Sequence, residues 1–302
     1  MSEPTRSRLD PLHQVAAPVE RWHDGERTAA DDELVAEEPL EIRTRTMDHG
    51  SGDGAVGDAR FETLAVVMRT PGHDDELAAG FLYTEGLIAG RTELAALVPG
   101  TDGDGLPSDN VLDVLPVSGV DLVRRLREAG YSRQFAVNAS CGICGKNTVA
   151  AACQALPPLT LPPDDAFAVA PRTLYALPER LRAGQRVFAA TGGLHAAAIF
   201  DADGTLLALR EDIGRHNAVD KLIGRALLDG TLPLEARVLL VSGRLSYEIV
   251  LKALAARIPL VAAVSAPSSL AVDLAAAGGI TLAAFLRGSG VNVYTHPQRV
   301  RP

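Results

Sequence analysis

The sequence predicts a protein of the α/β class that is divided into two domains. The chain of 302 residues is long enough for two domains of ordinary size. From residue 195 onward, apolar strand-like segments alternate with segments of helical periodicity. The later strand-like segments are continuously apolar, which is typical of a largely parallel sheet covered on both faces. Residues 156–163 contain four prolines and are the best candidate for a linker in front of this region.

The composition excludes several classes of protein. Hydrophobic residues make up 47% of the chain and charged residues 22%, so the chain can build a core and is not disordered overall. No uninterrupted apolar run reaches the roughly 18 residues of a membrane-spanning helix, so we expect no membrane span. The first 20 residues are polar and lack the apolar centre of a secretory signal. Three cysteines in such a chain indicate the reducing cytosol, and we expect a cytoplasmic protein.

The negative charge is concentrated at the start of the chain. The net charge is −9, and residues 1–59 hold 14 of the 38 acidic residues but only 6 of the 29 basic ones. The rest is therefore near neutral, which leaves room for a local basic site, and it shows no basic stripe of the kind that binds nucleic acid. Residues 1–35 have few large apolar groups, so we expect a disordered acidic tail to which we assign no function.

Residues 36–155 are expected to form a smaller α+β domain. Apolar and alternating segments predict its strands, and helical spacing of apolar residues predicts its helices, the first of them capped by Asp74 or Asp75. The last helix carries Cys153, which reads as a small core residue. The expected strands are residues 38–46, 61–69 and 111–117, and the expected helices are residues 76–88, 119–130 and 148–154.

Residues 156–302 are expected to form the larger domain. It begins with a helix, continues with two strands joined by a hairpin turn at residues 201–204, and then alternates helices with strands. The expected helices are residues 171–183, 217–228, 246–256 and 268–277. The expected strands are residues 195–200, 206–210, 237–241, 259–264 and 281–286.

The expected N-terminal domain ends in a loop that holds a Cys-x-x-Cys pair, Cys141 and Cys144, each followed by glycine. One pair alone is not a four-cysteine zinc site. It can be a redox dithiol, half of a metal site or a sulfur-handling loop, or simply two buried small residues. The glycines indicate a loop that lets another group approach the backbone, and the charge of Lys146 favours thiolate over thiol.

Polar residues gather where strands end and helices begin, at residues 191–195, 211–217, 242–246, 265–269 and 287–290. In an open α/β sheet, ligands bind at such ends. Glycine and serine at helix starts leave N–H groups for an anion, and Arg215, Arg244 and Arg287 can add charge-assisted contacts. Each stretch can also be a simple turn, and histidine, aspartate and asparagine there can be capping residues. The side chains singled out as ligand-binding candidates are His195, Asp212, His216, Asn217 and Arg244.

Five motifs in fixed order carry a recognisable pattern: SCGICGK, TGGLHAAAIF, REDIGRHNAVDKLIG, VSGRLSYEIV and FLRGSGVNVYTHP. Together they resemble the FdhD family of formate dehydrogenase accessory sulfurtransferases, of the FdhD/NarQ type, over roughly residues 36–300. The resemblance implies a cytosolic homodimer. It also implies a protein that carries sulfur from a cysteine desulfurase to the molybdenum cofactor in its bis(guanine dinucleotide) form, for insertion into formate dehydrogenase.

The resemblance also places functional residues. The persulfide carrier of the family falls on Cys141, and Cys144 is either an alternative carrier or a resolving thiol that expels the sulfur as sulfide. The cofactor-binding segment of the family falls on residues 285–290, for which GDP would serve as a fragment mimic. Its members here are Phe285, Leu286, Arg287, Gly288, Ser289 and Gly290, and we count Lys146 with them. By type alone, Asp212 and Asn217 are candidates to read the edge of a guanine.

The second domain of the family resembles the cytidine deaminase fold, a three-layer arrangement that fits the expected order of elements. A zinc deaminase carries a His or Cys ligand and a catalytic Glu on one helix start and Pro-Cys-x-x-Cys on the next. The corresponding starts here, at Gly214 and Ser242, hold a histidine but neither the glutamate nor the cysteines. We therefore expect no bound zinc.

Two other functional classes remain open at this point. A thiol-disulfide oxidoreductase would also use Cys-x-x-Cys, although its motif usually opens a helix after a strand, whereas proline-rich sequence follows this one. A non-catalytic chaperone for the molybdenum cofactor would keep the strand-end site and would not need the thiols.

Overall fold

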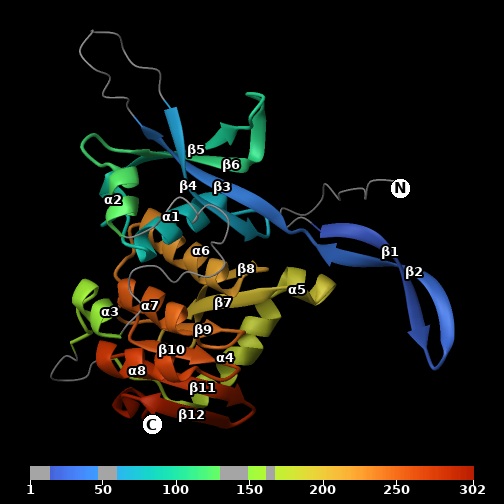
Figure 1. The fold of residues 1–302 in the computed structure, drawn as a ribbon. Helices are drawn as coiled ribbons and strands as arrows, with labels where there is room; N and C mark the ends of the chain where they lie inside the picture. The colour runs from blue at the N-terminus through green and yellow to red at the C-terminus, as the bar shows by residue number, and fades with distance from the viewer. Residues whose placement is uncertain (1–13, 47–59, 130–148, 161–166) are drawn as a thin grey trace, which may run out of the picture.

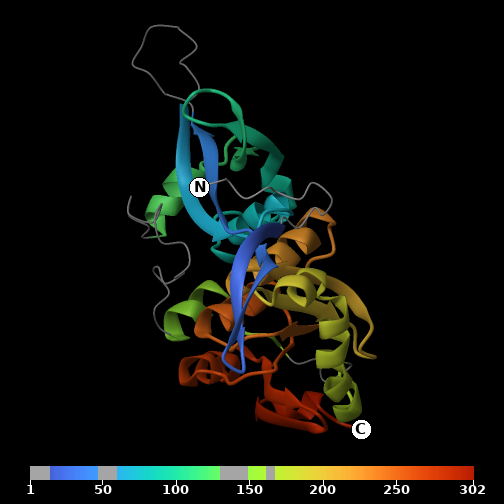
Figure 2. The same cartoon turned by 90° about the vertical axis from the view of Figure 1, so that its right-hand side faces the viewer.

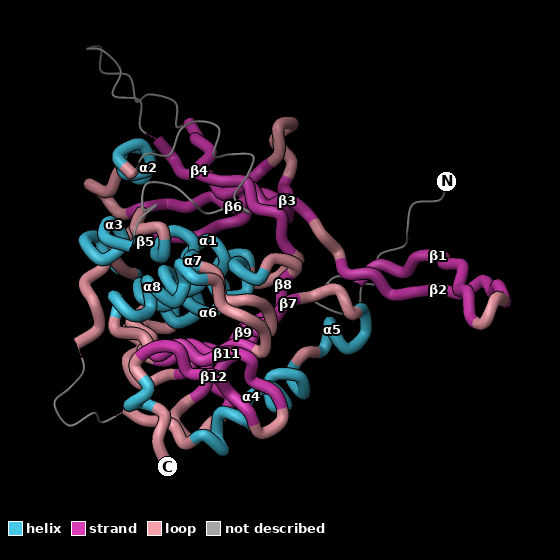
Figure 3. The backbone as a smooth tube through the Cα atoms, turned by 60° about the horizontal axis from the view of Figure 1, so that its bottom comes forward, coloured by secondary structure: helices cyan, strands magenta, loops and turns pink. Residues whose placement is uncertain are grey.

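The computed structural model describes residues 14–46, 60–129, 149–160 and 167–302 of the protein. Its strands form three sheets, namely a two-stranded hairpin, a four-stranded sheet and a six-stranded sheet (Figure 1). The two larger sheets belong to separate domains, and a group of helices lies between them, as Figure 3 shows. The mixed α/β class expected from the sequence is confirmed.

The N-terminal domain is built around the four-stranded sheet. Its elements are β3 (Glu38–Thr46), β4 (Arg60–Arg69), α1 (Asp74–Thr84), a 3-10 turn (Arg91–Glu93), β5 (Leu94–Thr101), β6 (Pro107–Pro116) and α2 (Leu122–Glu128). The strand order is β4-β3-β6-β5, with only the β3–β6 pair parallel. Leu40 and Leu64 point to one face of the sheet and join a core with Leu77 and Leu82 of α1. This core places α1 between the sheet and the second domain.

The C-terminal domain contains the six-stranded sheet and its covering helices. Its elements are α3 (Val149–Ala155), α4 (Pro171–Gly184), α5 (Arg186–Thr191), β7 (His195–Phe200), β8 (Leu206–Asp212), α6 (Arg215–Leu228), β9 (Val238–Val241), α7 (Tyr247–Ala255), β10 (Leu260–Ala263), α8 (Ser269–Gly278), β11 (Thr281–Arg287), β12 (Gly290–Thr295) and a 3-10 turn (Pro297–Arg299). No helix in the described ranges is long and apolar enough to cross a membrane.

This domain has three layers. The sheet order is β12-β11-β10-β9-β7-β8, in which β9, β10 and β11 run parallel and the other pairs are antiparallel. On one face Leu239 and Val261 pack beneath α6, α7 and α8. On the other face Leu240 and Ala262 pack against α4. Because both faces are covered, consecutive residues of these strands are all apolar, which is why the sequence shows continuous runs.

The boundary between the domains differs from the expected one. The sequence predicts α3 as the last helix of the N-terminal domain, with the division at residue 156. In the structure Ala152 is fully buried in the core under α7 and α8, and Cys153 packs against that same core. α3 therefore belongs to the C-terminal domain, and the proline-rich segment follows it instead of separating it from that core.

Residues 14–35 correct the expectation of a disordered tail. They form an antiparallel hairpin of β1 (Gln14–His23) and β2 (Glu26–Val35) that reaches away from the body in Figure 1 and lies in front of it in Figure 2. Asp24 and Gly25 both have positive φ, 50° and 85°, and make the tight turn that suits a two-residue hairpin. The Asp-Gly signal was present in the sequence. It was missed because small and acidic side chains give these strands no continuous apolar face.

The domains meet where α1 crosses α6. A Cβ atom at Gly80 would collide with the backbone carbonyl of Asp220, and one at Gly224 would collide with that of Glu76. The two glycines therefore let the helix backbones touch, and Leu227 of α6 extends into the core of the N-terminal domain. Such a contact fixes the two domains as one unit around the crossing.

Candidate functional site

The polar stretches singled out in the sequence meet at one edge of the six-stranded sheet. His195 opens β7 and pairs with Asp212 at the end of β8. Ser242, just after β9, donates its N–H to Ala196 of β7 at 2.9 Å. Phe285 near the end of β11 donates to Ser265, just after β10, at 3.2 Å. Since β7 runs antiparallel to β9, its start lies beside the ends of the parallel strands, so the convergence predicted from the sequence is confirmed.

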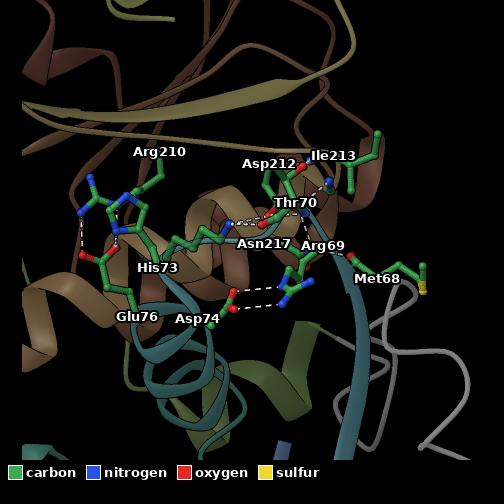
Figure 4. A network of polar contacts seen from close by, with 12 residues as sticks. Met68, Arg69, Thr70, His73, Asp74, Glu76, Arg210, Asp212, Ile213 and Asn217 are labelled. Atoms are coloured by element: carbon green, nitrogen blue, oxygen red, sulfur yellow. Dashed lines mark hydrogen bonds and ion pairs between the residues drawn. The ribbon is translucent and has the colours of Figure 1, made fainter. Parts of the chain in front are cut away.

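Asp212 is the centre of a buried network at this edge (Figure 4). Its side chain has no exposed surface. One carboxylate oxygen accepts from the Gly214 N–H at 2.8 Å and from Asn217 Nδ2 at 2.9 Å. The other accepts from the Thr70 N–H at 3.2 Å and lies 2.7 Å from Lys221 Nζ. Because Thr70 belongs to the N-terminal domain, this carboxylate ties the two domains together.

Two ion pairs border the same network. Arg69, fully buried at the end of β4, donates to both carboxylate oxygens of Asp74 at 3.0 and 2.9 Å. Arg210 of β8 makes a two-bond contact with Glu76 of α1 at 2.5 Å for each bond. Paired, hydrogen-bonded charges of this kind tolerate burial, whereas removal of one partner would leave the other charge uncompensated.

The geometry bears on the sequence proposal that Asp212 and Asn217 read a guanine. Asn217 donates from Nδ2 both to Asp212 and to the Met68 carbonyl, at 2.8 Å for the latter. Both side chains are buried, at 0% and 7% exposure. A direct contact of either with a ligand would require the network to open, so their observed part is to hold the domains in register.

His216 lies between the starts of α6 and α7. Its Nε2 is 3.1 Å from Ser246 Oγ and 3.7 Å from a carboxylate oxygen of Glu248. Burial, reinforced by the positive charges of Lys252 and Arg215, lowers the pKa of His216 to about 4. The imidazole is therefore neutral at pH 7 and can accept or donate one hydrogen bond at this position.

His195 and Arg215 face each other near Gly243. A Cβ atom at Gly243 would lie 3.4 Å from His195 Nδ1 and 3.5 Å from Arg215 Cδ. Burial first, and then the charge of Arg215, lower the pKa of His195. The buried Nε of Arg215 has no hydrogen-bond partner in the described part of the chain. This corner thus combines a neutral imidazole with a positive charge, as an anionic ligand would require.

A groove of about 490 Å³ opens beside His195 on the face of the sheet that α4 covers. Its walls come from α4, α5, the glycine turn after α5 and the ends of β9 and β10. Its lining includes the side chains of Leu181, Gln185, Phe188, His195 and Ser242, and Gly193. The helix α5 was not expected from the sequence, so this groove could not be foreseen.

Glu211 holds the α5 wall in place. Its two carboxylate oxygens accept the first N–H groups of α5, from Val187 at 3.1 Å and from Phe188 at 2.9 Å. Glu211 is buried, with 6% exposure. A carboxylate in this position satisfies helix-start donors that would otherwise have no partner. Sequence reasoning gave Glu211 no role. No sequence pattern shows that a carboxylate on a strand caps a helix that begins more than 20 residues earlier.

Residues 285–290, where the sequence resemblance leads us to expect a cofactor segment, form the turn from β11 to β12. Phe285 has a positive φ of 55°, and Gly288 one of 52°. The guanidinium of Arg287 lies 5.7 Å from the Phe285 ring centre, and Arg287, Gly288, Ser289 and Gly290 are exposed while Leu286 is buried. The sequence reading ended the sheet at β11. The added strand β12 makes this segment a hairpin turn that presents one arginine and bare backbone to solvent.

The remaining candidate site residues lie partly outside the described residues. Arg244 is exposed in the loop before α7, at the same edge. Cys141, Cys144 and Lys146 lie outside the described residues. Within the described residues, no group of three or more His, Cys, Asp or Glu side chains is arranged to hold a metal ion.

Comparison with known proteins points to one family. The model of the FdhD/NarQ family matches residues 37–301. The sulfur carrier protein FdhD of Streptomyces coelicolor is 49% identical over 286 residues, which cover 93% of this chain and 94% of that protein. The protein of the same name from Mycolicibacterium paratuberculosis is 49% identical over 278 residues, covering 91% and 94%. That from Sulfurisphaera tokodaii is 43% identical over 276 residues, covering 91% and 94%.

A solved structure shares the fold. The crystal structure of a formate dehydrogenase accessory protein from Desulfotalea psychrophila superposes with a TM-score of 0.68, covering 95% of this chain and 99% of that chain. The two sequences are 22% identical, so the likeness concerns the arrangement of the elements.

Proposed function

The chain belongs to the FdhD/NarQ family, and on that premise we propose that it is a sulfur carrier in the maturation of formate dehydrogenase. The finer proposal is that it passes persulfide sulfur from a cysteine desulfurase to the bis(guanine dinucleotide) form of the molybdenum cofactor, which makes it a sulfurtransferase. The observation that carries the proposal is the family match over residues 37–301, together with the Cys141–Cys144 pair in the sequence.

The receiving step needs a thiolate. Cys141 as thiolate attacks the terminal sulfur of the donor persulfide, a new S–S bond forms at Cys141, and the donor cysteine leaves as thiolate. The step changes no overall oxidation state, so it requires no external oxidant or reductant. Lys146 and the N–H groups of the glycine-flanked loop favour the anionic form.

Release can follow two routes, which differ in the role of Cys144. As an alternative carrier, Cys144 would hold the same sulfur. As a resolving thiol, it would attack the inner sulfur of the Cys141 persulfide, close a disulfide and expel hydrosulfide, after which a reductant must reopen the pair. The fate of Cys144 after turnover, thiol or disulfide, distinguishes the routes.

The cofactor, as the substrate of this carrier, is proposed to bind at the strand-end edge. Exposed Arg287 and the glycine backbone at residues 288–290 can meet phosphate groups, and Arg215 and Arg244 bring further positive charge to the same edge. His195 and His216, neutral at pH 7, can donate or accept hydrogen bonds without repelling these cations.

Likeness of the second domain to the cytidine deaminase fold is also part of the proposal. Support comes from the three layers and from α6 and α7, which both begin at the same sheet edge. The segments at Gly214 and Ser242 carry no catalytic glutamate and no Cys-x-x-Cys, so zinc-dependent deamination is not proposed and we expect no tightly bound zinc. A homodimer in the cytoplasm, with a cysteine desulfurase and formate dehydrogenase as partners, completes the proposal.

The test is mass spectrometry of the full chain after incubation with a cysteine desulfurase and cysteine. We expect one added sulfur atom on the peptide that contains Cys141 and Cys144, and none after Cys141→Ala. Cys153→Ala is the matched control, because Cys153 packs against the core and should leave loading unchanged. Sulfur found only on Cys153 would refute the carrier assignment. A non-catalytic chaperone would still support formate dehydrogenase after both loop cysteines are replaced.

A further inference from the structure

We propose that Gln185 is a specificity-determining residue of the strand-end groove and reads the edge of a heterocycle with a 2-amino-4-oxopyrimidine ring. Guanine and pterin share this ring edge, and the cofactor of the proposed function contains both. The inference therefore rests on that function for its ligand, although its geometric basis is independent.

The side-chain amide of Gln185 is the first observation. Gln185 is only 4% exposed, yet it lines the groove. Its backbone N–H and carbonyl are used, by Arg182 and Ala189 respectively, but its side chain makes no hydrogen bond with any described residue. Among the described residues Arg215 Nε is the fully buried side-chain polar atom without a partner, so the amide atoms of Gln185 keep contact with the space of the groove. An amide that faces a groove and has no protein partner can hydrogen-bond a ligand there in place of water.

The neighbouring walls suit a flat ring. Phe188 lies beside the groove with the guanidinium of Arg182 stacked 4.4 Å from its ring centre. Leu181 and Pro178 add apolar surface, and Ser242 Oγ accepts the Ala196 N–H, which leaves its own proton to donate. An apolar slot with a few fixed polar groups is the usual form of a site for an aromatic heterocycle.

Two walls of the groove, α5 and the turn at Gly193, are held in place by contacts with other elements. The α5 wall, which carries Phe188, is fixed by the two hydrogen bonds from its first N–H groups to Glu211. On the far side Gly193 lies against Val35 of the hairpin, which a Cβ atom at Gly193 would contact at 2.9 Å. Gln185 thus stands in a preformed site, and binding would not have to order its walls.

Alternative readers of a guanine edge are already occupied. Asp212 and Asn217 satisfy each other and the N-terminal domain within a buried network. By contrast, the side-chain amide of Gln185 makes no hydrogen bond with any described residue. Its amide can accept from the ring N1–H and donate to the ring carbonyl oxygen in one plane, which is how side-chain amides read base edges.

The location fits a ligand that also reaches residues 285–290. The groove borders His195, Ser242 and Val264, at the edge of β7, β9 and β10. Phe285 lies next along this edge, hydrogen-bonded to Ser265. Three strand spacings separate β7 from β11, about 14 Å in all. Ring recognition at Gln185 and phosphate contacts at Arg287 can therefore belong to different parts of one elongated substrate.

Calorimetric titration of the full chain with GDP, and separately with pterin, tests the assignment. Gln185→Leu keeps the shape but removes both hydrogen bonds, so we expect it to weaken binding of at least one probe roughly tenfold. Gln185→Glu should keep that probe, since a carboxylate accepts from N1–H and the 2-amino group, and should bind ADP no better than Gln185→Leu does. Gln154→Leu, on the exposed face of α3, is the matched control and should change nothing.

A comparison of two ligands on the wild-type protein does not depend on how the variants fold. GDP methylated at N1 lacks the donor that Gln185 would accept, so it should bind roughly tenfold more weakly than GDP if guanine is the ring read here. A different result would assign the groove to the pterin. In that case Gln185→Leu would weaken the binding of pterin alone, and the wild type would bind methylated and unmethylated GDP with equal affinity.

Equal affinities of wild type and Gln185→Leu for both probes, or no binding of either probe by the wild type, would overturn the inference. Sulfur loading of Cys141, measured on the same samples, keeps the proposed function separate. Normal sulfur loading without Gln185-dependent ring binding would refute the Gln185 assignment alone. Gln185-dependent ring binding without sulfur loading would refute the carrier function alone.

Discussion

At the scale of single residues, Arg287 carries the clearest expectation for phosphate binding. It is exposed on the β11–β12 turn, and no acidic residue follows Asp273 in the sequence to offset its charge. We expect Arg287→Ala to weaken GDP binding by about 1.5–3 kcal/mol, the usual worth of a hydrogen bond to a charged group. Isothermal calorimetry measures this directly.

The control for that variant lies at the other end of the same sheet. Arg237 immediately precedes β9, so Arg237→Ala removes the same charge far from the strand ends and should leave GDP affinity unchanged. Sulfur loading at Cys141 should be normal in both variants. If GDP binds equally well to the wild type and to Arg287→Ala, residues 285–290 are a turn with a solvated arginine.

His216 should shape the response of stability to pH. Its pKa is about 4 in the folded protein, against a usual value near 6.5. Between these values the unfolded chain binds more protons, so the free energy of unfolding falls as pH falls from about 6.5 to 4, by at most about 1.4 kcal/mol per pH unit. Lowered pKa values at His195 and His73 act in the same direction.

Denaturant unfolding between pH 7 and pH 4.5 measures the effect. His216→Gln removes the titrating group and should give a shallower loss of stability with falling pH. His23→Gln is the control, since His23 is exposed in the hairpin with 94% of its side-chain surface accessible. Parallel curves for the wild type and His216→Gln would show that His216 is not held neutral by its surroundings.

At the scale of elements, the crossing of α1 and α6 should depend on two glycines. In Gly224→Ala the new methyl group meets the Glu76 carbonyl, and backbone cannot move aside as a flexible side chain can. We expect destabilisation of about 3 kcal/mol or more, at the upper end of overpacking effects, measured by thermal or urea unfolding. Gly103→Ala, where a Cβ atom meets nothing within 4 Å, should be nearly neutral. Comparable stability of the two variants would contradict a close backbone contact at the crossing.

The elements that the sequence predicted are those with strong periodicity or long apolar runs. Strands β9, β10 and β11 and helices α6, α7 and α8 lie within a few residues of their expected positions. The missed elements lack such signals. Strand β5 contains Pro99 and Gly100, which read as a break, and β12 alternates exposed and half-buried residues at a sheet edge. Their pairing depends on neighbouring strands and not on their own composition.

At the scale of the whole molecule, topology explains why part of the site could be predicted. Any largely parallel sheet brings its strand ends to one edge, so five stretches that are far apart in sequence were expected to meet, and they do. The roles of individual side chains could not be predicted in that way. Asp212 appears in sequence as one of several polar residues, and its partner Thr70 lies 142 positions earlier, in the other domain. Gln185 carried no signal, because its significance is that its side-chain amide lines the groove without a hydrogen-bond partner among the described residues.

The two halves of the proposed activity lie in different parts of the chain. In the proposed function, sulfur is received at Cys141 and Cys144, while the cofactor binds at the edge formed by β7, β9, β10 and β11. This separation predicts that variants at the edge load sulfur and fail to deliver it, whereas variants of the cysteines fail at loading.

Transfer of labelled sulfur tests the central claim most directly. The protein is loaded by a cysteine desulfurase with sulfur-labelled cysteine, freed of small molecules, and mixed with formate dehydrogenase that contains unsulfurated cofactor. We predict that the label moves from wild-type protein to the cofactor as dehydrogenase activity appears, and that Cys141→Ala transfers none. Label that stays on the wild-type protein while activity appears, or full activity with Cys141→Ala, would contradict the account.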